Sequence, residues 1–388
     1  MKISSIRSWP VTVPSDRGPM SYFFLRVDTD AGVSGYGEAC DSYGCSYGTV
    51  LATLIDDVYA PLLIGQEVTA APAVAEQLRL ATRRRLGDAW VAVQARSAVE
   101  IALWDLLGRA AGRSVSDLIG RVRDRVAVYA SAAFLEEGPA DWHADQLRPI
   151  LDRGVRMVKL RVGPDWRADL ETLARVRDLL GPGIEVAIDG SETYTLPTAR
   201  EIARRLADLG VVWFEEPMPQ GARAGIQELA RCSPVPLAYG EHLYGRDEAI
   251  GAIRNGELSV LQADAATTGG IEEARQMALL GAHFGVRVVP HNCAGPLALA
   301  ANLHVAATIP AVRLLEYPIN CMPAYATLSP ESPTGLDAIV DGELAIPDGP
   351  GLGMTLDESA LAANPYQALG RRVAGTLAGV PDRFVGDR

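Results

Sequence analysis

Charged residues recur in this sequence at the ends of short apolar runs, about one βα unit apart. Lys159 and Arg161 lie in MVKLRVG, and from Arg161 the following steps are 28, 26, 26, 23, 27 and 25 residues. Each run is rich in Val, Ile and Leu, which is typical of a strand buried on both faces. In a closed parallel barrel the carboxyl ends of the strands converge on one face, so these charged side chains are expected to meet there. The residues reached by these steps are Asp189, Glu215, Glu241, Asp264, His291 and Glu316.

Three of these residues predict a metal site. Asp189, Glu215 and Glu241 end three successive runs at equal spacing. Three carboxylates that face each other repel, and they cannot all stay ionised without a cation. Ligation by oxygen alone selects a hard divalent ion, most simply Mg²⁺. The alternative is that they cap helix N-termini, as Asp189 could do for the helix near Thr198.

The other strand ends supply acid–base groups. Asp264 and His291 end adjacent strands, so Asp264 could orient the imidazole and raise its basicity. Lys159 and Arg161 alternate by two, so both point into the barrel, where a pair of cations suits a carboxylate substrate. Ion pairs of these cations with the metal-site carboxylates are compatible with that role. Glu316 is either a hydrogen-bond donor, when protonated, or a partner for Lys159.

The elements that position these groups can be read along the chain. Residues 1–40 predict an antiparallel meander, and helical patterns follow at about 49–64, 70–86 and 89–112. Two polar loops broken by Gly and Pro, at 13–21 and 41–48, are candidate lids. The expected divisions are an α+β domain at 1–122, a barrel at 123–320 and a segment at 321–388 that returns to the first domain.

Composition excludes several classes of protein. The net charge of −12 and the pI near 5.0 argue against nucleic acid and anionic membranes as partners. No stretch approaches the roughly 20 apolar residues of a membrane span. The five cysteines lack CxxC spacing, and the N-terminus shows no signal peptide, so a cytoplasmic protein with reduced thiols is expected. We expect a homo-oligomer, although no segment of the sequence specifies its state.

Together these motifs resemble the enolase superfamily, and within it the mandelate racemase branch of the mandelate racemase/muconate lactonizing enzyme family. SAVEIALWDLLGR looks like the helix of that family's capping domain, and K-x-R stands where the family has a K-x-K-type motif. WFEEP, GEH, the Asp264–His291 dyad and IPDGPGLG are similarly placed. The resemblance implies an α/β fold, a modified TIM barrel (β/α)7β under an α+β capping domain formed by the N-terminal region and the C-terminal segment. It also implies Mg²⁺ on the three carboxylates, and proton abstraction next to a substrate carboxylate to give an enediolate.

Two residues depart from the family pattern. Arg161 replaces the commoner second lysine, and Ser191 replaces the usual Asn, which loosens the surroundings of the metal without removing a ligand. Arginine keeps its proton at ordinary pH, so His291 is the evident base and needs almost no tuning of its pKa. Lys159 is a competitor, since burial near Mg²⁺ and Arg161 would depress its pKa. A single base suits a syn β-elimination, in which the protonated histidine returns its proton to a departing hydroxyl.

The expected function is that of a Mg²⁺-dependent hydro-lyase that dehydrates a sugar acid or related hydroxy acid to a 2-keto-3-deoxy acid. One alternative is a cycloisomerase of a sugar-acid lactone, or an epimerase or racemase, on the same site. A second is a non-catalytic protein that binds a metabolite. The expected catalytic residues are Lys159, Arg161, Asp264, His291 and Glu316. The candidates for contact with the small-molecule carboxylate substrate are Arg17, Tyr22, Tyr43, His242 and Asn292.

Overall fold

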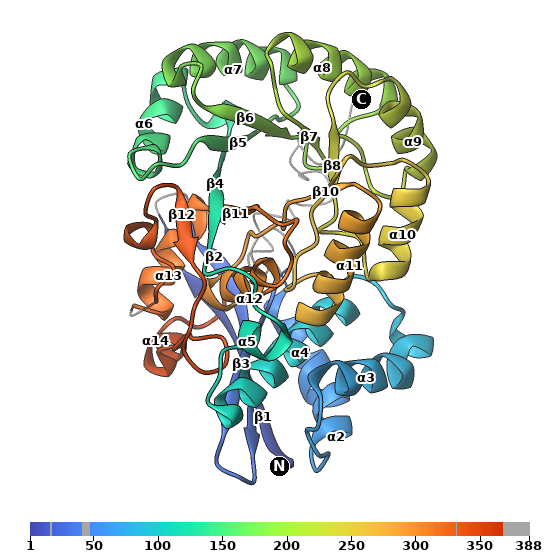
Figure 1. The fold of residues 1–388 in the computed structure, drawn as a ribbon, viewed down its shortest axis with the longest axis vertical. Helices are drawn as coiled ribbons and strands as arrows, with labels where there is room; N and C mark the ends of the chain where they lie inside the picture. Colours follow the sequence, from blue (N-terminus) through green and yellow to red (C-terminus); the bar gives the residue numbers. More distant parts are fainter. Residues whose placement is uncertain (16–17, 41–46, 331, 368–388) are drawn as a thin grey trace.

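The computed structural model describes residues 1–15, 18–40, 47–330 and 332–367. It begins with the predicted meander, an antiparallel sheet of β1 (Ile3–Val13), β2 (Met20–Thr29) and β3 (Ser34–Ala39). In Figure 1 this sheet lies at the N-terminal end of the molecule, below the barrel.

Helices cover the sheet at the predicted places, with one interruption. The first pattern, 49–64, forms two short α-helices separated by a π-helical turn, which a helical periodicity alone does not reveal. The helical elements before the barrel are α1 (Gly48–Leu54), η1 (Ile55–Tyr59), α2 (Ala60–Leu63), α3 (Ala71–Leu86), α4 (Val91–Ala111) and α5 (Val115–Ile119).

Helix α4 packs directly on β3 because that strand presents glycines to it. A Cβ atom at Gly37 would lie 2.0 Å from the Ala98 carbonyl oxygen, and one at Gly35 would lie 2.2 Å from that of Ala102. Only glycine on the strand, facing alanine on the helix, permits this approach. The long central helix is therefore clamped between the sheet and the barrel (Figure 1).

The barrel consists, within the described residues, of eight parallel strands with helices outside them. Neighbouring strands pair in the order β10-β9-β8-β7-β6-β5-β4-β11, and the amide of Glu316 donates to the Pro290 carbonyl at 3.2 Å across the remaining gap. The strands are β4 (Arg125–Phe134), β5 (Met157–Arg161), β6 (Glu185–Asp189), β7 (Phe214–Glu215), β8 (Leu237–Tyr239), β9 (Val260–Leu261), β10 (Arg287–Val288) and β11 (Leu314–Pro318). The helices between them are α6 (Ala140–Leu151), α7 (Trp166–Leu180), α8 (Leu196–Asp208), α9 (Arg223–Cys232), α10 (Arg246–Arg254), α11 (Ile271–His283) and α12 (Pro296–Ala307), with the 3₁₀ turn η2 (Leu135–Glu137) after β4.

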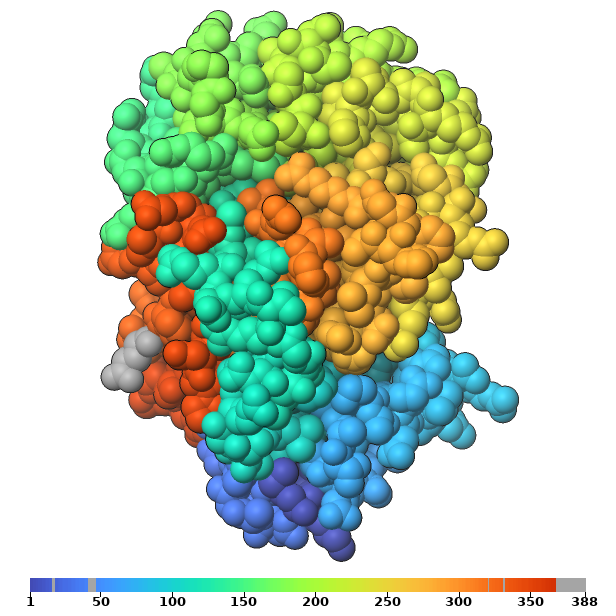
Figure 2. Space-filling model, in the orientation of Figure 1, coloured from blue at the N-terminus to red at the C-terminus, as the bar shows by residue number. Residues whose placement is uncertain are grey.

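The last described segment turns back to the first domain. After η3 (Ile319–Cys321), α13 (Met322–Leu328) and η4 (Leu336–Ala338), strand β12 (Glu343–Ala345) pairs antiparallel with β4. Helix α14 (Glu358–Ala363) then contacts β1, and Glu358 forms an ion pair with Arg26 of β2 at 2.6 Å. Figure 2 shows this segment, in red, lying against both the barrel and the capping domain. The predicted (β/α)7β barrel with its α+β cap is confirmed, while the predicted domain boundaries stay predictions.

Two buried carboxylates of the capping domain hold it on the barrel. Glu38 accepts hydrogen bonds from the amides of Gly295, Leu297 and Ala298 at 2.5–3.0 Å, at the start of α12. Glu100 of α4 accepts from the amides of Ile271 and Glu272 at 2.7 and 3.1 Å, at the start of α11. The free N–H groups of two barrel helices are thus satisfied by residues of another domain. None of the helices in the described ranges combines the length and apolar character that a membrane span needs.

Candidate active site

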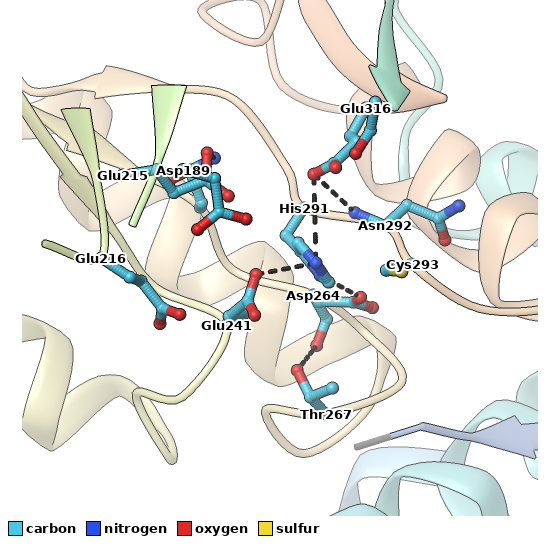
Figure 3. A network of polar contacts seen from close by, with 12 residues as sticks. Asp189, Glu215, Glu216, Glu241, Asp264, Thr267, His291, Asn292, Cys293 and Glu316 are labelled. Atoms are coloured by element: carbon cyan, nitrogen blue, oxygen red, sulfur yellow. Dashed lines mark hydrogen bonds and ion pairs between the residues drawn. The ribbon is translucent and has the colours of Figure 1, made fainter. Parts of the chain in front are cut away.

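The charged residues predicted at the strand ends gather at one mouth of the barrel, and six of them are labelled in Figure 3: Asp189, Glu215, Glu241, Asp264, His291 and Glu316. All eight are buried, with at most 9% of each residue exposed. Six of the side chains are joined by ion pairs through Lys159 and His291, and Arg161 forms a separate pair with Asp189, because in a parallel barrel every strand delivers its last side chains to the same face. The eight residues of this network are Lys159, Arg161, Asp189, Glu215, Glu241, Asp264, His291 and Glu316.

Lys159 lies between two carboxylates from opposite sides of the barrel. Its Nζ contacts Glu215 Oε1 and lies 2.8 Å from Glu316 Oε1. Burial lowers the pKa of Lys159, but these two carboxylates outweigh it and hold that pKa well above its ordinary value. In this arrangement the two carboxylates favour the ammonium form of Lys159, while the expected depression of its pKa by Mg²⁺ and Arg161 stays a prediction.

Arg161 is fixed against the first predicted metal ligand. Its Nε lies 3.0 Å from Asp189 Oδ2, and its Nη1 donates to the Ala132 carbonyl at 2.6 Å. The other oxygen of Asp189 accepts from the Ser191 amide at 2.7 Å and from the Ser191 hydroxyl at 3.3 Å. Asp189 does not cap helix α8, which has Thr195 as its N-cap and no side-chain bond there.

Glu215 is oriented by two residues that sequence reasoning missed. Its Oε2 accepts from Trp213 Nε1 at 3.1 Å and from Gln262 Nε2 at 2.6 Å. Both donors lie two positions before a predicted site residue, Glu215 itself and Asp264. Alternation by two along a strand was the signal that could have found them, since such residues share a face of the sheet.

His291 is held at both ring nitrogens. Nδ1 lies 2.8 Å from Asp264 Oδ2, as predicted, and Nε2 lies 2.7 Å from Glu241 Oε2. Burial lowers the pKa of His291, but Glu241 and Glu316 outweigh it and raise that pKa well above its ordinary value. The charged imidazole is favoured in this arrangement, and Nε2 can act as a base only when Glu241 has another partner. The expectation that His291 needs almost no tuning stays a prediction for that state.

Asn302 of α12 is a further residue that the sequence did not reveal. Its Nδ2 donates to Asp264 Oδ1 at 2.9 Å and to the His291 carbonyl at 3.1 Å, and its Oδ1 accepts from the Ala265 amide at 2.9 Å. It therefore locks the carboxylate of the dyad in the orientation that faces the imidazole. Nothing local marks this asparagine, which lies inside an apolar helical run.

Glu316 closes the network from the last strand. Its Oε2 accepts from the Tyr129 hydroxyl at 2.9 Å and lies 4.0 Å from His291 Nε2. Burial raises the pKa of Glu316, but Lys159 and His291 outweigh it and lower that pKa below its ordinary value. Two roles were left open for Glu316, a partner of Lys159 or a protonated hydrogen-bond donor. In the structure Glu316 is the partner of Lys159.

The residues expected to contact the substrate do not all lie at the barrel mouth within the described structure. Asn292 lies in the mouth, with its Nδ2 3.4 Å from the Tyr325 hydroxyl, and Tyr22 is buried with its hydroxyl 3.8 Å from Met20 Sδ. His242 is buried against Glu216, 3.0 Å from Nδ1 to Oε1. Arg17 and Tyr43 lie outside the described residues, so their predicted contact with the substrate stays a prediction.

The three predicted metal ligands fit a hard divalent ion by their chemistry. Asp189, Glu215 and Glu241 supply only carboxylate oxygens, from the ends of β6 and β7 and the turn after β8. Each carboxylate is partnered by a cation of the protein, so the cluster carries compensated negative charge. Acceptor-only oxygen ligands of this kind suit Mg²⁺.

Comparison of the sequence with models of known protein families identifies the family of this chain. Residues 8–120 match the model for the mandelate racemase/muconate lactonizing enzyme N-terminal domain, and residues 142–360 match the enolase C-terminal domain-like model. The chain belongs to the mandelate racemase/muconate lactonizing enzyme family. The predicted resemblance is thereby confirmed, and the chain is placed among the enzymes of the enolase superfamily.

Relatives in this family carry more than one activity. Arabinonate dehydratase of Saccharolobus solfataricus is 29% identical, with 87% of this chain and 89% of that protein covered. D-galactarolactone cycloisomerase of Agrobacterium fabrum is 30% identical, with 88% and 90% covered. A racemase structure from Streptomyces coelicolor with bound magnesium has a TM-score of 0.83 and 26% identity, with 94% of this chain and 100% of that chain covered.

Proposed function

We propose that this protein is a Mg²⁺-dependent dehydratase of a sugar acid or related hydroxy acid. The observation that supports the proposal is that only one side chain among the described residues of the site, His291, is placed to act as a base. Arg161 is fixed on Asp189, and Lys159 is an ammonium held by Glu215 and Glu316. His291, with Asp264 behind it, is the side chain in the network that can exchange a proton near neutral pH once Glu241 is engaged elsewhere.

In the proposed reaction His291 Nε2 takes the proton from the carbon next to the substrate carboxylate. Lys159 and Arg161 face the carboxylate and the negative charge that develops on it. The protonated imidazole then gives its proton to the hydroxyl on the next carbon, whose C–O bond breaks to release water. The resulting enol becomes a 2-keto-3-deoxy acid, so one hydroxy acid yields one keto acid and one water. Held by Asp189, Glu215 and Glu241, Mg²⁺ would supply positive charge beside the substrate carboxylate.

A cycloisomerase of a sugar-acid lactone is the second candidate. It is supported by the 30% identity to the D-galactarolactone cycloisomerase over 88% of this chain. In such a reaction the leaving group is the ring oxygen, which can depart without help from an acid, so the same His291 suffices. An epimerase or racemase is supported less, because Arg161 does not offer a second base.

The test is a screen of acid sugars and their lactones with Mg²⁺, in which 2-keto acids are detected by a carbonyl reagent. A dehydratase forms keto acid from an open acid sugar, whereas a cycloisomerase consumes a lactone and leaves open acids untouched. His291→Asn is the control for chemistry at this site. A protein that bound these compounds and turned none over would support the non-catalytic alternative. We further propose a cytoplasmic homo-oligomer that acts on a small carboxylate and needs neither nucleic acid nor membrane.

A further inference from the structure

A second group of ligands lies beside the predicted magnesium site. Glu192, Glu216 and His242 each offer one donor atom, and these atoms all lie within 4.8 Å of one another. His242 Nδ1 lies 3.0 Å from Glu216 Oε1 and 3.5 Å from Glu192 Oε1. We propose that these three residues form a second site for a divalent cation, distinct from the one formed by Asp189, Glu215 and Glu241.

The two sites are built at the ends of the same three strands. Glu192 follows β6, Glu216 follows β7 and His242 follows β8, so one ligand of the second site comes one to three residues after each predicted magnesium ligand. In Figure 3 the Glu216 carboxylate points away from Asp189. A cation bound by all three would tie together the loops that position the magnesium ligands. This role is structural and independent of the proposed reaction.

Burial and charge both favour a cation here. Glu216 and His242 are 3% and 4% exposed, while the Glu192 side chain is 23% exposed and leaves the group open to solvent on one side. The group contains two carboxylates, Glu192 and Glu216, and one imidazole, His242. A protonated His242 can balance only one of the two carboxylates, whereas a divalent ion would balance both.

An unsatisfied polar atom of the group points to a missing ligand. Among the described residues, His242 Nε2 is a buried atom of the group itself that has no hydrogen-bond partner. Buried polar atoms are rarely left unpaired, and an ion with its coordinated water would satisfy this one.

The donor set selects the kind of ion. Two carboxylates and one imidazole suit a borderline ion such as Zn²⁺, whereas oxygen ligands alone suit Mg²⁺. The capping domain also touches this group, since Trp90 lies 5.2 Å from the His242 ring, centroid to centroid. Zn²⁺ at this site would therefore hold the loops in contact with the cap.

The experiment uses the full chain, freed of metal and titrated with Zn²⁺ alone. In Asp189→Asn, which removes a ligand of the magnesium site, we expect one Zn²⁺ per chain with an imidazole nitrogen among its ligands by X-ray absorption. Adding Glu192→Gln should weaken binding at least tenfold, and the exposed Glu171→Gln on α7 is the matched control that should leave it unchanged. Adding His242→Gln should remove the nitrogen ligand.

Three outcomes would overturn the proposed site. The first is that Asp189→Asn binds no Zn²⁺, and the second is that a nitrogen ligand persists in Asp189→Asn/His242→Gln. The third is that Glu192→Gln leaves the affinity for Zn²⁺ unchanged. Because Glu192 is partly exposed, its variant carries the test even if the His242 variant does not fold. Failure of the proposed dehydration would leave the Zn²⁺ stoichiometry unchanged, so the two proposals fail separately.

Discussion

Nε2 of His291 lies 2.7 Å from Oε2 of Glu241, so the expected base and an expected metal ligand share an ion pair. The opposite nitrogen lies 2.8 Å from Asp264 Oδ2. The imidazole is therefore oriented by one carboxylate and blocked by another. His291 Nε2 can reach a substrate only when the Glu241 carboxylate binds another partner, such as a metal ion. Proton abstraction is therefore linked to occupancy of the predicted magnesium site.

The first prediction concerns the base. In D₂O with a substrate or slow analogue, His291→Asn should abolish exchange of the α-proton, because Arg161 and Lys159 are both held as cations. Lys159→Met should slow turnover, since it removes charge beside the carboxylate, but leave detectable exchange. Mass spectrometry of the recovered substrate measures the exchange. Exchange that persists in His291→Asn and disappears in Lys159→Met would transfer the base to the lysine.

The second prediction concerns removal of the metal. Exhaustive chelation should abolish turnover, and Mg²⁺ should restore it, because Asp189, Glu215 and Glu241 offer only oxygen ligands and the ion that they would hold binds an anionic substrate. Asp189→Asn should lose this response, as followed by the initial rate at increasing Mg²⁺. Undiminished turnover by the demetallated protein would show that the metal site is wrongly assigned.

The third prediction concerns Asn302, a positioning residue. Asn302→Ala should lower kcat by about 10- to 100-fold, because Asp264 loses the donor that orients it toward His291. The pH dependence of kcat should shift with it, which a merely structural loss would not produce. Asn255→Ala, on a residue that pairs with Glu257 away from the mouth, is the control. An unchanged pH profile would refute the positioning role.

The fourth prediction is acid destabilisation by a buried histidine. His304 Nδ1 accepts from the Ser116 amide at 3.2 Å and Nε2 lies 3.1 Å from the Leu352 carbonyl oxygen, so the ring is neutral. Burial lowers the pKa of His304 from 6.5 to about 4. The unfolded chain therefore binds the proton first, and stability present above pH 6.5 is lost as the pH falls toward 4, by roughly 3 kcal/mol at most.

Urea unfolding at several pH values measures this loss. His304→Gln should flatten the dependence of the unfolding free energy between pH 6.5 and 4, whereas the exposed His283→Gln should preserve it. An equal slope in both variants would contradict the assignment.

The fifth prediction concerns the contact between the domains. Glu38→Ala should lower the free energy of unfolding by about 2–4 kcal/mol, because it leaves the amides at the start of α12 unpaired in a buried place. Glu171→Ala, on the exposed face of α7, should change it by less than about 0.5 kcal/mol. Equal unfolding midpoints in urea for the two variants would show that the cap does not depend on Glu38.

The sequence by itself determined the barrel and the residues at its mouth. Buried parallel strands are continuous apolar runs, so Asp189, Glu215 and Glu241 were visible as charges that end such runs at a constant spacing. The pairing of Asp264 with His291 followed from the adjacency of their strands. These relationships depend on local periodicity and on the order of strands, both of which are written along the chain.

Only the tertiary structure decided how these groups are charged and oriented. The contact of His291 with Glu241, the clamp of Asn302 on Asp264 and the capping of α12 by Glu38 join residues that lie far apart in the sequence. Each depends on the relative depth and rotation of packed elements, which no local pattern records. A pKa is decided at the same level, because it follows from the burial of a group and from the charges that packing brings within a few ångströms of it.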